Sequence, residues 1–199
     1  MPDAPGLELI RGEIEQLHPG AVLATSFDRG QPSLLVDPAR ILAVLNWLHD
    51  APGQEYRFLS SLHAADYLPA EPRFGVHYEL LNRDRVERVR VKAMLEDPSS
   101  AGGADVGGVE DSLARSAPPA SVSGPAAGGL PVIDSCVDLF PTAEFQEREV
   151  FDFFGIVFMG YPNLTRILLP EDYVGYPQRR DFPIGGEPVT FTYNERNYG

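Results

Sequence analysis

The stretch Glu147–Pro183 (EREVFDFFGIVFMGYPNLTRILLPEDYVGYPQRRDFP) decides how this chain is organised. Its first residues continue a helix predicted over 143–154, which Thr142 opens as the N-cap and Gly155 closes in the left-handed conformation. Beyond Gly155 the helical spacing of apolar residues ends. The stretch therefore begins as a helix and continues as an irregular arm.

The faces of the predicted helix differ in chemistry. Glu144, Arg148 and Asp152 recur every fourth residue, so we expect ion pairs between them along one face. Glu147 lies at the border of the apolar stripe, where a carboxylate needs a polar partner. The stripe itself consists of Val150, Phe153, Phe154 and Val157.

The C-terminal arm, residues 156–199, combines chain breakers with many apolar side chains. Prolines and glycines recur along it, so no helix or central strand of ordinary length fits between them. The arm is nevertheless too apolar for a disordered tail, and structureless runs beyond roughly 12–15 residues are uncommon unless functional. We therefore expect an extended arm that lies along another surface, much of it belonging to another protein.

Charged side chains in the arm are balanced in number, with three arginines against three acids. The bidentate fork of arginine favours paired positions at protein interfaces. We therefore expect salt-bridged arginines at an interface rather than a phosphate or substrate site. The residues concerned are Arg166, Arg179 and Arg180, with Glu171, Asp172 and Asp181.

A catalytic interpretation of the helix also exists, because clustered carboxylates separate one another's pKa values. Glu147, Glu149 and Asp152 are the candidates for a general acid/base group. Ion pairing with Arg148 and helix capping explain the same carboxylates without a substrate, and we favour that structural interpretation. The catalytic alternative predicts turnover by the isolated chain and an open cleft beside Glu147.

Composition makes the chain acidic, with a formal net charge of −13 over 199 residues. Nucleic acid and anionic membrane surfaces require a basic footprint, so neither is expected as a direct ligand. The single cysteine, Cys136, argues against a disulfide framework and is expected to be a small buried residue. No run approaches the ~20 apolar residues of a membrane span, and the first residues lack a signal-peptide pattern, so a cytosolic location is expected.

Residues before the predicted 143–154 helix indicate an α+β domain. Apolar residues at helical spacing predict helices over 7–17 and from Asp37-Pro38 to Pro52-Gly53. We expect a mainly antiparallel sheet covered by helices on one face, followed by the irregular Pro/Gly-rich C-terminal arm. Strands are expected at 21–27, 33–36, 56–62, 74–80 and 89–95, the last two as an antiparallel hairpin that is apolar on one side only. A loop containing His63, Asp66 and Tyr67 is expected after the third strand.

Composition also divides the chain. Residues 1–140 are expected to form the α+β domain. Residues 141–199 are expected to form the 143–154 helix and the docking arm. Within the first part, 97–129 is rich in Gly, Ala, Ser and Pro and has almost nothing to bury, so we expect a flexible surface insertion. Its deletion from 98 to 129 is expected to leave assembly unchanged.

Motifs of common catalytic chemistry are missing from the sequence, including phosphate loops, dinucleotide fingerprints, nucleophile elbows and metal-binding His/Cys spacings. The histidines His18, His49, His63 and His77 lie on separate predicted elements and are expected to be surface or sheet residues. We therefore predict no catalytic, cofactor-binding or metal-binding residue in this chain.

Several motifs in the quoted stretch resemble a known family. They are Glu147-Arg148-Glu149, Phe151-Asp152-Phe153-Phe154-Gly155-Ile156, Gly160-Tyr161-Pro162-Asn163-Leu164, Ile167-Leu168-Leu169-Pro170-Glu171-Asp172-Tyr173, Gly175-Tyr176-Pro177 and Arg179-Arg180-Asp181-Phe182-Pro183. In these residues the chain is similar to the C subunit of the proton-pumping NADH:quinone oxidoreductase, the 30 kDa subunit family of respiratory complex I. A weaker likeness extends back through 58–67, 74–81 and Glu96-Asp97-Pro98.

The resemblance implies a scaffold subunit of a hetero-oligomer, without its own cofactor or catalytic residue. Partner subunits would carry the FMN and iron–sulfur clusters that pass electrons from NADH to quinone. The family lies in the peripheral arm on the cytoplasmic side of the cell membrane, packed against the quinone-site D subunit and near the iron–sulfur subunits B and I. Structural or interface roles are therefore expected for Glu147, Arg148, Glu149, Asp152, Arg166, Arg179, Arg180 and Asp181.

Four positions depart from the usual residues of the family, namely Tyr161, Thr165, Tyr176 and Gln178. They leave open which branch of the family is present. The equivalent subunit of a membrane-bound hydrogenase, or of another quinone reductase with a different electron donor, remains an alternative.

Overall fold

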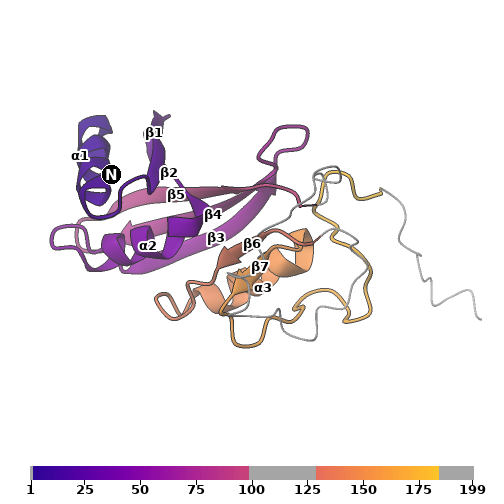
Figure 1. Ribbon diagram of the computed structural model, residues 1–199. Helices are drawn as coiled ribbons and strands as arrows, with labels where there is room; N and C mark the ends of the chain where they lie inside the picture. Colours follow the sequence, from indigo (N-terminus) through magenta and orange to yellow (C-terminus); the bar gives the residue numbers. More distant parts are fainter. Residues whose placement is uncertain (1, 99–128, 184–199) are drawn as a thin grey trace, which may run out of the picture.

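The computed structural model describes residues 2–98 and 129–183 (Figure 1). The expected insertion at 97–129 and the end of the arm beyond 183 thus lie almost entirely outside the described residues. In chain order the elements are α1 (Ala4–Leu17), β1 (Val22–Asp28), β2 (Gln31–Val36), the short 3-10 helix η1 (Pro38–Arg40), α2 (Ile41–Asp50), β3 (Phe58–Asp66), β4 (Phe74–Asn82), β5 (Glu87–Leu95), β6 (Val132–Asp134), α3 (Ala143–Phe154) and β7 (Val157–Met159).

Strands β1 to β5 form one sheet in the order β1-β2-β5-β4-β3. Its neighbouring strands are antiparallel, except that β2 and β5 run parallel. The predicted α+β class with a mainly antiparallel sheet is therefore confirmed. Strands β6 and β7 form a separate two-stranded parallel sheet, which joins the segment before α3 to the segment after it.

One face of the five-stranded sheet is covered by helices. Leu34 on β2, Tyr78 on β4 and Val91 on β5 are fully buried and share one core with buried side chains of all three α-helices. Residues between them, such as Ser33 and Lys92, are only partly covered. Figure 1 shows α2 and α3 on one side of the sheet and α1 beside strand β1. The sheet thus has a helix-covered face and an open face.

Helix α3 has the predicted bounds, and Gly155 closes it in the left-handed conformation with φ 70°. Thr142 holds the predicted N-cap position, but its side chain makes no capping hydrogen bond. Its backbone is already helical, with φ −67° and ψ −16°, and its hydroxyl donates a hydrogen bond of 3.1 Å to the Leu59 carbonyl. The hydroxyl ties α3 to the edge strand β3, because a free carbonyl of that edge offers an acceptor.

Strand β3 is longer than predicted, so His63 and Asp66 belong to the strand rather than to the loop after it. His63 pairs with His77, and Asp66 pairs with Phe74, the first residue of β4. The hairpin is also less one-sided than expected, because Gly75 and His77 are buried on its second face. Tyr67 folds over them: a Cβ at Gly75 would lie 2.7 Å from its ring.

Burial of His77 predicts a pH dependence of stability. Desolvation, followed by nearby positive charge, lowers the pKa of His77 to about 3, so the ring is neutral in the fold. In the unfolded chain a histidine takes up a proton below about pH 6.5, so stability falls as the pH drops from about 6.5 toward 3. We expect urea titrations to show a loss of roughly 2 kcal/mol between pH 7 and pH 5 that His77→Gln removes and His18→Gln retains. An unchanged slope in His77→Gln would contradict the assignment.

Candidate functional site: the anchorage of the C-terminal arm

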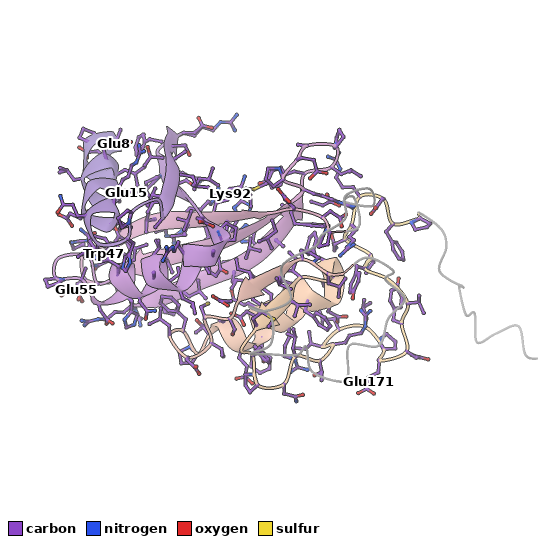
Figure 2. The ribbon with its side chains drawn as sticks, viewed as in Figure 1. Glu8, Glu15, Trp47, Glu55, Lys92 and Glu171 are labelled. Atoms are coloured by element: carbon purple, nitrogen blue, oxygen red, sulfur yellow. The ribbon has the colours of Figure 1, made fainter. Side chains whose placement is uncertain are left out.

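The arm does not leave the domain after α3 but folds back along it. Its described part, 156–183, contacts α3 and the end of the sheet where β3, β4 and β5 meet. Three buried charged residues hold it or the segment that leads into it, namely Asp152, Arg73 and Glu147. Figure 2 shows Glu171 on the outer side of this arm, pointing away from the domain.

Asp152 on α3 holds the first part of the arm. Its carboxylate is fully buried, and one oxygen accepts hydrogen bonds from the N–H groups of Ile167, Leu168 and Leu169 at 3.1, 2.8 and 2.9 Å. The other oxygen pairs with Arg166 Nη1 at 2.7 Å. Burial opposes the charged form, but these hydrogen bonds outweigh it and lower the pKa of Asp152. The carboxylate therefore acts as an internal anion in a nest of backbone donors.

Arg166 and Arg148 complete this anchor by donating to carbonyl groups. Arg166 reaches the carbonyls of Asp152 and Gly175, each at 3.0 Å. Arg148 donates to the Thr165 carbonyl at 3.1 Å and to the Arg166 carbonyl at 3.0 Å. Backbone groups that no helix or sheet satisfies are thus paired with charged side chains.

The predicted ion-pair ladder along α3 is wrong. Arg148 and Asp152 both turn toward the arm, and Glu144 is exposed. An exposed pair four residues apart contributes only about 0.2–0.5 kcal/mol, whereas a buried donor or acceptor without a partner costs about 1–3 kcal/mol. The larger penalty decides which partners these side chains take.

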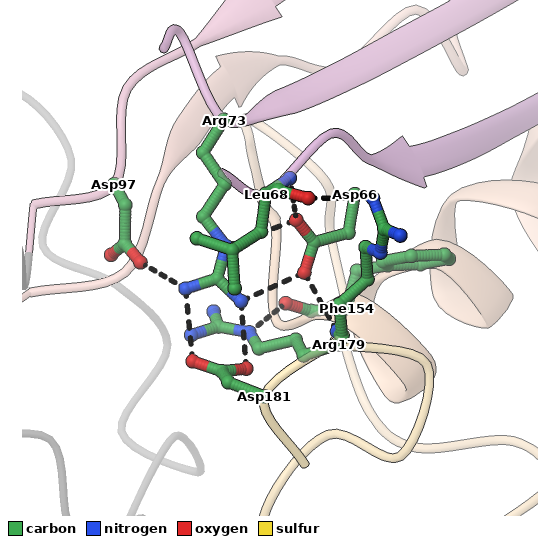
Figure 3. Close-up of polar contacts among 8 residues, drawn as sticks. Asp66, Leu68, Arg73, Asp97, Phe154, Arg179 and Asp181 are labelled. Carbon is green, nitrogen blue, oxygen red and sulfur yellow. Dashed lines mark hydrogen bonds and ion pairs between the residues drawn. The ribbon is translucent and has the colours of Figure 1, made fainter. Parts of the chain in front are cut away.

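Arg73 forms the second anchor, where four segments of the chain meet (Figure 3). Its guanidinium, 5% exposed, lies 2.7 Å from a carboxylate oxygen of each of Asp66, Asp97 and Asp181. Burial opposes ionisation of Asp66, but the Arg73 hydrogen bonds and two backbone N–H groups bring its pKa down to about 2. Hydrogen bonds to Asp66 in turn raise the pKa of Arg73, and those from Arg73 lower the pKa of Asp181.

Arg179 and Arg180 fasten the arm beside this cluster. Arg179 donates to the Phe154 carbonyl at 2.7 Å, and its guanidinium lies 4.9 Å from the ring centre of Phe74 and 4.8 Å from that of Tyr176. Burial lowers its pKa. The backbone N–H of Arg180 donates to Asp66 at 2.8 Å. The expected balance of charges within the arm is therefore replaced by pairing with the domain, while Glu171 and Asp172 are exposed.

Glu147 forms the third anchor, between α3 and the segment that precedes it. It is 0% exposed and accepts hydrogen bonds from the Ser135 hydroxyl at 2.6 Å and the Cys136 N–H at 2.8 Å. These are the polar partners that its position on the helix required. Burial raises the pKa of Glu147 and of the Cys136 thiol. The catalytic alternative requires Glu147 to line an open cleft, but its side chain is fully buried, and Glu149 is exposed.

Sequence reasoning missed Arg73, Asp66 and Asp97 as site residues. Each lies at or near the end of a strand, and none belongs to a periodic pattern. Within 2–98 and 129–183, no group of three or more His, Cys, Asp and Glu side chains is arranged to hold a metal ion. In the same ranges, none of the helices is long and apolar enough to cross a membrane.

Comparisons with known proteins agree on one family. Residues 34–105 and 120–188 match the family described as the 30 kDa subunit of respiratory-chain NADH dehydrogenase. The chain is 38% identical over 177 residues to the C subunit of NADH-quinone oxidoreductase from Roseiflexus castenholzii, covering 89% of this chain and 84% of that protein. The subunit of the same name from Herpetosiphon aurantiacus is 38% identical over 168 residues, which cover 84% and 80%.

Two solved structures share the fold. A trypsin-resistant fragment of Nqo5 has a TM-score of 0.51 and 22% identity, covering 79% of this chain and 98% of the fragment. A chain of an archaeal membrane-bound sulfane sulfur reductase has a TM-score of 0.59 and 21% identity, covering 96% of this chain and 90% of that chain. At these identities the likeness supports the architecture alone.

Neutralising Asp152 is expected to release the arm. Asp152→Asn removes the charge that Arg166 and three N–H groups share, and breaking such a buried pair costs on the order of 3 kcal/mol. We expect trypsin to cleave after Arg166 at least tenfold faster, as followed by intact mass. Glu149→Gln, an exposed change on the same helix, serves as the control. Equal cleavage rates in both variants would count against Asp152 as the anchor.

Removing Arg73 is expected to reverse the contribution of its carboxylate partners to the pH dependence of stability. In the natural chain the low pKa of Asp66 contributes stability above about pH 4 that is lost as the pH falls toward 2. In Arg73→Met three neighbouring carboxylates repel one another, so their pKa values rise and the folded state binds protons more readily than the unfolded state. Thermal melts should then show this variant losing less stability than the natural chain between pH 7 and pH 4, because both share the loss at His77, while the exposed control Arg57→Met follows the natural chain.

Proposed function

Because the chain belongs to the 30 kDa subunit family of respiratory-chain NADH dehydrogenase, we propose that it is a scaffold subunit of an NADH:quinone oxidoreductase. Its relatives carry the name of one subunit of that enzyme, so this chain works in a hetero-oligomer. Its own part is to join subunits and hold the quinone-reducing module rigidly. The transfer of electrons from NADH through FMN and iron–sulfur clusters takes place in its partners.

The arm carries this proposal. Its backbone is fixed to the domain by Asp152, while large apolar side chains on its outer side remain in solvent, with Leu168 61% and Val174 68% exposed. Phe145 on α3 is 60% exposed as well. A rigid backbone that presents apolar side chains loses little conformational freedom on binding, and such side chains are typical of protein contact sites.

Three partners fit the proposed position. They are the quinone-site D subunit and the iron–sulfur subunits B and I, in the peripheral arm on the cytoplasmic side of the membrane. We assign the docking role to residues 141–199, apart from the α+β domain of residues 1–140, and exposed apolar side chains on the helix and arm support this role. Glu147, Arg148, Glu149, Asp152, Arg166, Arg179, Arg180 and Asp181 serve structure or the interface, and none of them acts on substrate.

A pull-down from gently solubilised membranes tests the proposal. The tagged chain should bring down large partners with flavin and iron–sulfur absorbance and NADH:quinone activity, while the isolated chain is inert. Partners with the same absorbance but another electron donor would move the chain to the hydrogenase or quinone-reductase branch. A chain that comes down alone and colourless would overturn the scaffold role.

Charged residues on the outer side of the arm should prevent assembly. Leu168→Glu with Val174→Glu removes two apolar contacts, and at about 1.5–3 kcal/mol for each buried side chain the affinity should fall by at least 100-fold. Leu9→Glu with Leu17→Glu, at exposed positions of α1, is the matched control and should assemble normally. Blue-native gels with an activity stain measure the outcome, and equal yields of the two variants would contradict the docking role of the arm.

A further inference from the structure

The open face of the five-stranded sheet is a second surface that the anchorage does not use. The strand register shows which residues lie on this face, because residues paired across neighbouring strands lie on the same face of a sheet. Along the three middle strands it carries Ser33 and Leu35 on β2, Arg88, Arg90 and Lys92 on β5, and His77, Glu79 and Leu81 on β4. Figure 2 shows Lys92 on the side of the sheet that faces away from α3.

Positive charge is concentrated on this face of an otherwise acidic chain. Arg88, Arg90 and Lys92 alternate along β5, so neighbouring members of the row lie ~6.6–6.8 Å apart. Glu79 on β4 is the acidic residue opposite the row, and it pairs with Arg90. The whole chain has 29 acidic residues against 16 Lys and Arg, so three basic side chains with one acid run against its composition.

Lys92 is the single lysine of the chain, and it is held in place. Its ammonium lies 4.1 Å from the centre of the Tyr67 ring, and the Tyr67 hydroxyl is 3.1 Å from His77 Nε2. A cation over an aromatic face keeps its charge while losing side-chain freedom. The row is therefore partly preorganised for a negatively charged ligand.

We propose that the open face binds an acidic, extended segment of a neighbouring subunit, whose carboxylates pair with Arg88 and Lys92; this inference rests on the proposed function. The geometry favours a narrow ligand, because the charges follow one strand. An anionic membrane fits less well, since recognition there takes about 4–8 Lys or Arg and the net charge of −13 opposes it. The same charge argument disfavours nucleic acid.

Zero-length cross-linking with a carbodiimide tests the proposal in intact membranes. The reagent joins an amine to a carboxylate that it touches, and Lys92 supplies the only side-chain amine of this chain. After digestion, mass spectrometry should find Lys92 joined to an Asp or Glu of another subunit. Lys92→Arg keeps the charge but cannot couple, so it should lose this peptide and still assemble.

Several results would overturn the inference. They are a Lys92 peptide joined only to this chain's own carboxylates, no Lys92 peptide at all, or binding of the chain to phosphatidylserine vesicles that Arg88→Glu with Lys92→Glu abolishes. The pull-down above separates the two proposals, because partners can be recovered while Lys92 remains unlinked.

Charge reversal supplies an independent readout. Arg88→Glu with Lys92→Glu should lower the yield of assembled complex at least tenfold, with a defect that deepens at low ionic strength, where repulsion is least screened. Arg11→Glu with Arg40→Glu changes the net charge equally on α1 and η1, on the helical layer, and should assemble as the natural chain does. Equal yields from the two double variants would count against the open face.

Discussion

The buried carboxylate of Asp152 is the interaction on which the shape of the arm depends. Residues 167–169 have no strand or helix partner, so their N–H groups would otherwise be desolvated without an acceptor. One oxygen atom satisfies all three, and Arg166 neutralises the charge that makes it so strong an acceptor. An apolar residue at 152 would avoid the desolvation cost of a buried carboxylate, but it could not fix the register of the arm against α3. Buried ion pairs can serve specificity in this way even where they add little net stability.

The Arg73 cluster extends the same logic across the molecule. Asp66 and Asp97 lie at the ends of β3 and β5, and Asp181 lies in the arm. One guanidinium therefore pairs with all three segments, and its contacts are complete only when all of them are folded. Stacking of Arg179 between Phe74 and Tyr176 adds an apolar contact beside it. With the backbone of the arm held by these two anchors, the large apolar side chains on its outer side, such as Leu168 and Val174, remain exposed to solvent.

Sequence patterns predicted the elements whose formation depends mainly on residues close together in the chain. The bounds of α3 follow from apolar spacing and from Gly155, and the hairpin of β4 and β5 follows from alternation. Long-range partners were not accessible in this way: spacing placed Arg148 and Asp152 on a helix surface, but only the folded chain shows that both serve arm residues well over ten positions away. Arg73 was missed because one arginine before a strand carries no periodic signal. Burial of His77 depended on Tyr67 folding back, which alternation along β4 cannot reveal.

The pairing of Arg73 with Asp181 joins residues 108 positions apart, which affects how the protein is made. Contacts of such long sequence separation form late, because the loop between them must first be closed. During synthesis, β4 leaves the ribosome long before Asp181 does, so the sheet can form while the arm is still unanchored. A chain interrupted before Asp181 can therefore build the sheet, and Asp152 can hold residues 167–169, but the second anchor at Arg73 cannot form. The last described turn of the arm thus becomes fixed only after Asp181 has been synthesised.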